Sequence, residues 1–224
     1  MTDRVNPKRS YDSPRRREQA AATRRDILES AQRLFERQGF AATKMAEIAS
    51  EAGVALKTVY AAFETKSGVL RALWHMLLRG DEDDVPVMAR QWYLEVLEEP
   101  DPERQLRLNA RNARAVKERI APLLDVIRHA APLDAESAAL CGRIQSDFYD
   151  NQGAIVKSLS ARGALAPGLD VARATDILWT LNHPDLWQLL VAQRGWTAEQ
   201  WEQWFADTSC GQLLAPGTAR ASAS

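Results

Sequence analysis

The stretch from Thr43 to Leu70, TKMAEIASEAGVALKTVYAAFETKSGVL, decides how the first third of this 224-residue chain should fold. Its spacing of apolar residues predicts two short helices joined by a turn at Gly53, which can take the left-handed backbone of a tight turn. Four residues are spaced to pack the two helices together: Ile48, Ala49, Val59 and Phe63. We therefore expect a helix-turn-helix, with Thr43 as the N-cap of its first helix.

The second helix of this pair leaves an outward face made of Leu56, Lys57, Thr58, Tyr60 and Ala61. A short exposed helix of this kind fits the major groove of DNA. We interpret Tyr60 as a functional residue, because an outward tyrosine otherwise exposes apolar area without purpose.

Working outward, the residues before this stretch predict a helix from about Glu18 that ends at Gly39, and Thr65 predicts the cap of a fourth helix. The predicted organisation is a flexible basic arm (1–17), a helix-turn-helix domain (18–66), a connecting helix (67–79), a larger domain (80–214) and a disordered tail (215–224). The acidic residues 80–84 are expected to form a boundary or surface loop.

The larger domain shows only helical patterns. We expect a short amphipathic segment over 87–98 and helices over 102–118, 120–130, 134–162, 170–181 and 197–213. Asn182-His183-Pro184 must break or kink its helix, and Thr197 with Gln200 forms a capping box. The predicted fold class is therefore all-α, with a three-helix N-terminal domain, a larger C-terminal bundle and about nine or ten helices in total.

The formal net charge of −1 hides a segregation of charge. Residues 1–80 carry 15 Lys and Arg against nine Asp and Glu, a balance of +6, and residues 81–224 carry 14 against 21, a balance of −7. Clustered basic residues favour binding to phosphates. The run Arg15, Arg16 and Arg17 could add minor-groove or phosphate contacts, or could be a solvated basic tail.

Several function classes find no support. There is no apolar run of about 18 residues for a membrane span, and the polar, basic start argues against a secretory signal. Cys141 and Cys210 are scattered thiols that fit a reducing cytoplasm, and with isolated histidines they predict no metal site. Phosphate-binding and nucleophile motifs are missing as well. We expect a cytoplasmic protein that is not an enzyme and needs no cofactor.

The stretch 43–70 resembles the DNA-binding signature of the tetracycline-repressor (TetR) family. The resemblance rests on Thr43, Ile48-Ala49, Ala52-Gly53-Val54, Thr58-Val59-Tyr60, Phe63, Thr65-Lys66 and Leu70. It covers about residues 20–75 closely, and it continues more weakly through Trp179–Trp187 and Arg194–Trp196. This many positions in register make it far more specific than a bare helix-turn-helix pattern.

The resemblance implies roles for single residues. Thr43, Lys66, Thr58 and Tyr60 are expected to contact the DNA backbone, and Lys44 is expected to bind DNA as well. Leu56, Lys57 and Ala61 take the positions that read bases, where Lys57 can donate to guanine O6 or N7 and Leu56 and Ala61 can only touch a thymine methyl. The sequence departs from the family at Ala62, where an aromatic or histidine phosphate contact is usual, and at Ser67, which is usually acidic.

The resemblance also implies a ligand pocket and a dimer built from the last two helices. The candidate pocket residues, each also explicable by simple packing, are Trp92, Tyr93, Asn109, Asn112, Phe148, Gln152, Trp179, Asn182 and His183. The candidate dimer residues, which could instead pack only within the subunit, are Trp187, Leu190, Trp201, Trp204 and Phe205.

Together these patterns predict a one-component transcriptional regulator, by family default a repressor. It would bind pseudo-palindromic double-stranded operator DNA as a homodimer and be released by a small-molecule effector. The alternative is a helical ligand-binding or protein-interaction module that has lost DNA binding, supported by Ala62 and by the few polar residues on the outward face.

Overall fold

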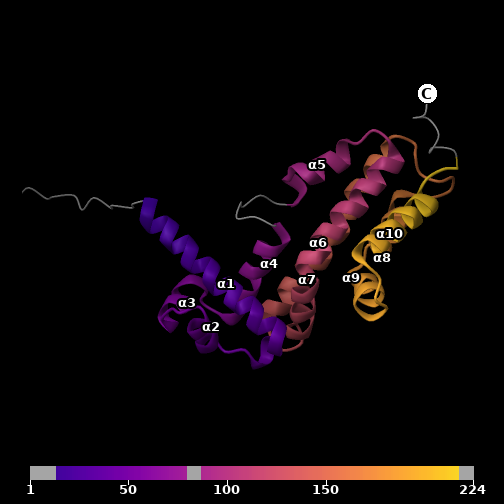
Figure 1. Ribbon diagram of the computed structural model, residues 1–224. Helices are drawn as coiled ribbons and strands as arrows, with labels where there is room; N and C mark the ends of the chain where they lie inside the picture. Colours follow the sequence, from indigo (N-terminus) through magenta and orange to yellow (C-terminus); the bar gives the residue numbers. More distant parts are fainter. Residues whose placement is uncertain (1–13, 80–86, 217–224) are drawn as a thin grey trace, which may run out of the picture. The chain divides into compact units, whose positions relative to one another are not determined.

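The computed structural model describes residues 14–79 and 87–216, and the described part of the chain is all-α, as predicted. The helices in chain order are α1 (Pro14–Ala42), α2 (Met45–Glu51), α3 (Leu56–Phe63), α4 (Lys66–Arg79), η1 (Val87–Ala89), α5 (Gln91–Glu98), α6 (Pro102–Ala130), α7 (Ala135–Ala161), α8 (Val171–Leu181), α9 (Pro184–Trp187), η2 (Gln188–Gln193) and α10 (Ala198–Leu213) (Figure 1). They form two compact units that divide within α4, between Leu73 and Trp74. We call them the N-terminal unit and the C-terminal unit.

The N-terminal unit is organised by α1, whose apolar stripe is buried as its period predicts. Ile27, Ala31 and Phe35 are fully buried. The helix begins earlier than expected, at Pro14, so Arg15, Arg16 and Arg17 belong to its first turns rather than to an arm. Gly39 takes φ +77° and bends the chain near the end of α1, which confirms the glycine stop.

The α2–α3 pair has the predicted helix-turn-helix connection. Gly53 takes φ +66°, the left-handed conformation that the turn requires. The N-cap of α2 is Lys44 and not Thr43, and the backbone N–H of Lys44 donates to the Glu47 carboxylate. The helix therefore starts one residue later than the threonine suggested, because the hydroxyl of Thr43 donates backward to the Gly39 carbonyl instead.

The α3–α4 junction is tight. Glu64 ends α3 with φ +61°, and the Thr65 hydroxyl then accepts a hydrogen bond from the Gly68 backbone N–H, which confirms the predicted cap. A Cβ atom at Gly68 would lie 2.1 Å from the Phe63 carbonyl oxygen. Only glycine fits at this position without a shift of the backbone.

In the C-terminal unit, α6 is one continuous helix, so the predicted division near residue 119 is wrong. Pro122 lies inside the helix and cannot donate to the carbonyl four residues earlier. The helix continues nevertheless, because Ile120, Leu123 and Leu124 around the proline are buried in the interior. Tertiary packing therefore outweighs the local penalty at this position.

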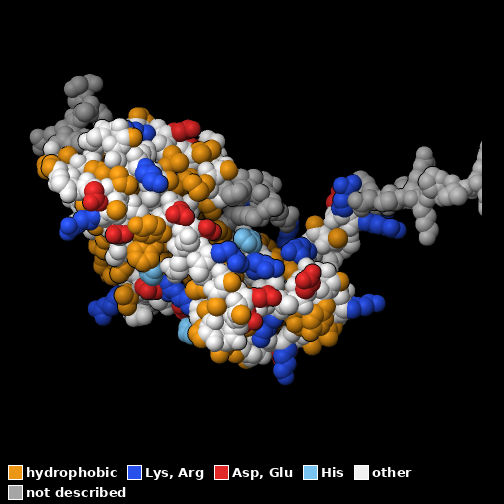
Figure 2. Space-filling model, turned by 180° about the vertical axis from the view of Figure 1, so that it is seen from behind, with side chains coloured by type: hydrophobic (Ala, Val, Ile, Leu, Met, Phe, Trp, Pro, Cys, Tyr) orange, Lys and Arg blue, Asp and Glu red, His pale blue; other side chains and the backbone are white. Residues whose placement is uncertain are grey.

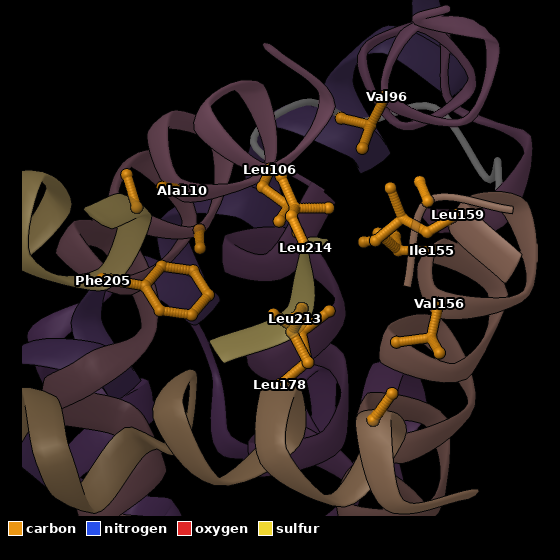
Figure 3. Packing of buried hydrophobic residues seen from close by; sticks show 14 of the residues in the cluster. Val96, Leu106, Ala110, Ile155, Val156, Leu159, Leu178, Phe205, Leu213 and Leu214 are labelled. Atoms are coloured by element: carbon orange, nitrogen blue, oxygen red, sulfur yellow. The ribbon is translucent and has the colours of Figure 1, made fainter. Parts of the chain in front are cut away.

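The core of the C-terminal unit is assembled from helices that are far apart in the chain. Side chains of α5, α6, α7, α8 and α10 point toward one another in Figure 3, among them Val96, Leu106, Ile155, Leu178 and Phe205. Arg114 of α6 fastens α10 from outside through ion pairs with Glu199 and Glu202. Helix α10 thus packs along α6 and closes the bundle.

The last helices begin and end where the sequence predicted. Helix α8 ends at Leu181, His183 is the N-cap of α9, and a turn of π-helix (η2) follows. The Thr197 hydroxyl and the Gln200 side chain form the predicted capping box of α10. Asp134 likewise caps α7 through the backbone N–H of Ser137.

Three predictions fall wholly or partly outside the described residues: the arm over 1–17, the acidic loop over 80–84 and the tail over 215–224. Within the described ranges, none of the helices has the length and apolar character needed to cross a membrane.

Candidate functional site

The outward face of α3 is the first candidate site, and its side chains lie where a groove could receive them. Leu56 is 41% exposed and Tyr60 48% exposed, so both large side chains are open to solvent on the same short helix. Lys57 and Ala61 are exposed, and Thr58 is half-buried. The opposite face of the helix carries Val59 and Phe63, which are core residues as predicted.

Arg24 of α1 holds the C-terminal end of α3 in place. Its guanidinium donates to the Ala62 carbonyl at 3.0 Å and lies 4.2 Å from the centroid of the Phe63 ring. This bond satisfies a carbonyl in the last turn of α3, where a helix has no partner of its own. Sequence reasoning missed Arg24, although it stands at the edge of the apolar stripe that starts with Ile27.

Lys66 and Thr43, which were expected to contact phosphates, are engaged within the N-terminal unit. The Nζ atom of Lys66 donates to the carbonyls of Phe40 and Thr43, at 2.6 and 2.9 Å, and lies over the Phe40 ring. Thr43 is 1% exposed. We therefore assign both side chains to holding the α1–α2 corner, because an ammonium bonded to two carbonyls and a buried hydroxyl are poorly placed to meet a phosphate.

Helix α2 is fastened to α1 by charged side chains. Arg33 donates to Glu51 at 2.9 Å, and Arg37 pairs with the same carboxylate at 3.6 Å. The hydrogen bond from Arg33 lowers the pKa of Glu51 below its usual value. These pairs orient α2 and leave Lys44 exposed at its start.

A second basic region lies at the start of α1. Arg15, Arg16 and Arg17 occupy exposed positions on successive residues of the helix. Figure 2 shows basic side chains gathered at this end of α1. Because they are helical, these arginines present a fixed spacing of charge, which an unstructured arm would not.

The second candidate site lies inside the C-terminal unit, around Lys117 of α6. The lysine is 4% exposed, and its ammonium donates to the side-chain oxygen of Asn182. The Nζ atom lies 4.7 Å from the centroid of the Trp201 ring and 5.4 Å from that of Phe148. Burial lowers the pKa of Lys117 to about 7.

Sequence reasoning missed Lys117. A usable signal was present, because Ala113, Lys117 and Ile120 follow one another at helical spacing on the buried stripe of α6. A lysine at a core position of an amphipathic helix is rare enough to be singled out.

His183 and Trp179 lie next to this lysine cluster. Burial lowers the pKa of His183, and the positive charges of Arg128 and Lys117 lower it further against the opposing effect of Asp185. The Trp179 ring meets the His183 ring edge-on, with centroids 4.9 Å apart. Four of the nine predicted pocket residues are thus connected with Lys117: Phe148, Trp179, Asn182 and His183.

The other five predicted pocket residues lie along α5, α6 and α7, and three of them serve as ties between helices. Asn112 donates to the backbone carbonyl of Trp92, and the Tyr93 hydroxyl donates to the carbonyl of Asn151. In the remaining two, the Nδ2 atom of Asn109 and the Oε1 atom of Gln152 are buried without a hydrogen-bond partner among the described protein atoms.

Three of the predicted dimer residues lie inside the subunit. Trp201 and Phe205 have no exposed surface and Trp187 is 6% exposed, because Trp201 stacks on Phe205 and meets Trp187 edge-on within the core. The aromatic area of α9 and α10 is therefore no argument for a partner at these three positions. Leu190 and Trp204 remain partly exposed, and Leu189, which precedes Leu190 in the chain, is 46% exposed.

Comparison with known proteins gives a consistent result. Residues 27–73 match the bacterial regulatory proteins of the tetR family. The probable HTH-type transcriptional regulator ArpR of Pseudomonas putida is 30% identical over 166 residues, which cover 71% of this chain and 76% of that protein. In structure, a SmeT–triclosan complex matches with a TM-score of 0.68 and 18% identity, over 88% of this chain and 94% of that one. A regulator from Saccharomonospora viridis in complex with choline matches with a TM-score of 0.66 and 17% identity, over 87% and 98%.

Proposed function

Because the chain belongs to the TetR family of transcriptional regulators and is not an enzyme, we propose that it is a repressor that binds a pseudo-palindromic operator as a homodimer. A small molecule bound in the C-terminal unit would release it from the DNA. The protein would act in the cytoplasm, where both DNA and a reducing environment for the free thiols of Cys141 and Cys210 are found.

The observation that carries the DNA-binding proposal is the exposed face of α3. Tyr60 and Leu56 project from a helix whose other side is locked into the core by Val59 and Phe63, so the exposed face is rigid. Two such helices in a dimer would enter successive major grooves about 34–36 Å apart. Lys57 is the cationic side chain on this face and can hydrogen-bond a guanine, and Tyr60 and Thr58 would set the docking angle on the backbone.

The link between effector and DNA would run through α6 and α4. The guanidinium of Arg119 on α6 donates to the carbonyls of Leu77 and Leu78 in the last turns of α4. A ligand that shifts α6 would therefore move the end of α4, the helix that continues into the N-terminal unit. A few kcal/mol of differential affinity between two positions of α4 would suffice to change operator occupancy.

Dimerisation would use the surface of α8 to α10 that remains exposed. Leu189 and the half-exposed Leu190 and Trp204 offer apolar area there, and the exposed polar residues of α10 would form the rim. The predicted interface thus keeps two of its five residues and gains Leu189.

A direct test measures binding to the DNA that flanks the gene of the protein. Fluorescence anisotropy with the wild type, Lys57→Ala and Tyr60→Ala should show that both variants weaken binding by about tenfold or more. Lys157→Ala, at an exposed lysine of α7, is the matched control and should bind like the wild type. Equal binding by all four proteins, without dependence on salt, would favour a ligand-binding module that has lost DNA binding.

A further inference from the structure

Lys117 is a cation in the interior of the C-terminal unit, and among the residues that the structure describes no carboxylate forms an ion pair with it. Its protein partners are the neutral Asn182 amide oxygen and two aromatic rings. An ammonium has three N–H donors, and Asn182 accepts from one of them. A buried charge without a counter-charge is strongly disfavoured, because neither an amide nor an aromatic face replaces the lost hydration.

Among the described residues, buried side-chain donors without a partner outnumber buried acceptors: two indole N–H groups and one amide N–H₂ stand against the Oε1 atom of Gln152, and the hydroxyls of Ser137 and Ser209 can serve as either. The indole N–H groups of Trp201 and Trp179 are buried and have no hydrogen-bond partner among the described protein atoms. Trp201 is the ring that faces the lysine, and Trp179 contacts His183 beside it. Two turns along α6 from Lys117, the side-chain N–H₂ of Asn109 is likewise buried without a partner. Buried donors of this kind call for an acceptor.

The charges nearest to this cluster do not supply that acceptor. Asp185 is the closest acidic group that influences His183, and it is already paired with Arg128 at the surface. Glu202 of α10 is paired with Arg114. The interior around Lys117 is therefore electropositive, with aromatic rings beside the ammonium and no described carboxylate paired with it.

We propose that the C-terminal unit binds an organic carboxylate, whose anionic group pairs with Lys117 and whose apolar part packs against Trp201 and Phe148. The carboxylate supplies the counter-charge that the described residues do not provide, and its second oxygen can accept from a buried indole N–H. A cationic ligand is disfavoured, because the ammonium of Lys117 already occupies the aromatic faces that would attract it. The proposal that this carboxylate is the effector rests on the proposed function, whereas binding of the carboxylate does not.

The test measures binding by the full-length protein through quenching of its tryptophan fluorescence. The probes are phenylacetate and octanoate, the neutral amide of each, and phenethylammonium. We expect both carboxylates to bind at least about tenfold more tightly than their amides. Phenethylammonium should bind more weakly than both carboxylates. Lys117→Met should remove the preference for the carboxylate, while Lys157→Met on the surface of α7 should retain it.

A second measurement needs no variant. Between pH 7 and 9 the wild-type affinity for octanoate should fall as Lys117 loses its proton, while the affinity for octanamide should stay constant. His183 does not contribute in this range, because burial already lowers its pKa from the ordinary histidine value; Asp185 and Arg128 are the charged groups beside it.

The proposal is overturned if neither carboxylate binds saturably at millimolar concentration, if Lys117→Met binds them as tightly as the wild type, or if phenethylammonium is preferred. Each of these results would assign Lys117 a purely structural role in tying α6 to Asn182. Because these measurements contain no DNA, they are independent of operator binding. A carboxylate that binds through Lys117 but leaves a DNA complex intact would contradict the release mechanism and leave the anion site standing.

Discussion

The Nζ atom of Lys117 lies 4.7 Å above the Trp201 ring, in a part of the protein where both side chains are almost fully buried. Helices α6 and α10 thus contact each other through this lysine and this tryptophan. The face of the indole ring partly replaces the hydration that the ammonium loses on burial. Compensation is incomplete, since burial lowers the pKa of Lys117 to about 7. The stability of the protein should therefore depend on the protonation of this one side chain.

Lys117→Met should make stability less dependent on pH. Between about pH 7 and the unfolded pKa of 10.5, the unfolded state binds the proton more strongly than the folded state, so wild-type stability due to this group rises with pH. Below pH 7 the folded protein carries the full cost of a buried charge. Methionine removes that cost, and the melting temperature should rise most at pH 6 and least near pH 10.

Thermal unfolding at pH 6, 8 and 10 measures this difference. Lys157→Met on the surface of α7 is the control, and its melting temperature should follow the wild type at each pH. The assigned cause would be contradicted if Lys117→Met melted below the wild type at pH 6 and the difference between their melting temperatures were the same at pH 10.

Gly68→Ala should destabilise the N-terminal unit by about 1–3 kcal/mol, because the added methyl would collide with the Phe63 carbonyl oxygen and force α4 away from α3. Gly142→Ala tests the same change in the exposed middle of α7, where nothing lies within 4 Å of the added Cβ. That variant should gain about 0.5–1 kcal/mol from reduced backbone freedom. Urea denaturation of both variants gives the comparison, and equal effects would refute the close approach at Gly68.

Two lysines of the N-terminal unit should separate stability from DNA affinity. Lys66→Met removes the donor to the Phe40 and Thr43 carbonyls and should cost about 1–3 kcal/mol of unfolding free energy. Lys57→Ala touches an exposed side chain and should change stability by less than about 0.5 kcal/mol while weakening operator binding. Chemical denaturation and fluorescence anisotropy on both variants measure the two effects. If Lys66→Met weakened operator binding without loss of stability, Lys66 would be a phosphate contact after all.

The salt dependence of operator binding tests the arginines at the start of α1. If Arg15, Arg16 and Arg17 neutralise phosphates, replacing all three with alanine should flatten the slope of log affinity against log salt. The expected change is about 0.9 for each phosphate that is no longer neutralised. The residues are already helical and exposed in the free protein, so no folding step would obscure the effect. An unchanged slope would identify the segment as a solvated basic end of the helix.

Leu189→Arg should reduce dimer formation, because it places a charge on the most exposed apolar side chain of the proposed dimer surface. Leu133→Arg is the matched control, since Leu133 is 66% exposed in the turn after α6. Sedimentation of both variants across a range of concentrations should show monomers only for Leu189→Arg. If the Leu189→Arg protein were fully dimeric, the dimer interface would not include Leu189.

The amino-acid sequence by itself determined the elements whose signals lie within a few residues of one another. The turn at Gly53, the caps at Thr65 and Asp134, the break at His183 and the capping box at Thr197 were all predictable, because each depends on a bond or a backbone angle inside one turn of chain. The same local spacing predicted the exposed face of α3, since the core side of a short helix fixes its outer side.

The tertiary structure alone decided what each buried or charged side chain meets. Lys117 bonds to Asn182 across 65 positions of the sequence, and Lys66 reaches Phe40 across 26, so no local pattern shows either partner. The same holds for Trp201, whose aromatic area is covered by its own subunit, and for Pro122, which surrounding contacts keep inside a helix. Periodicity identifies the face of a helix that is buried, but the packing of distant segments selects the atoms that cover it.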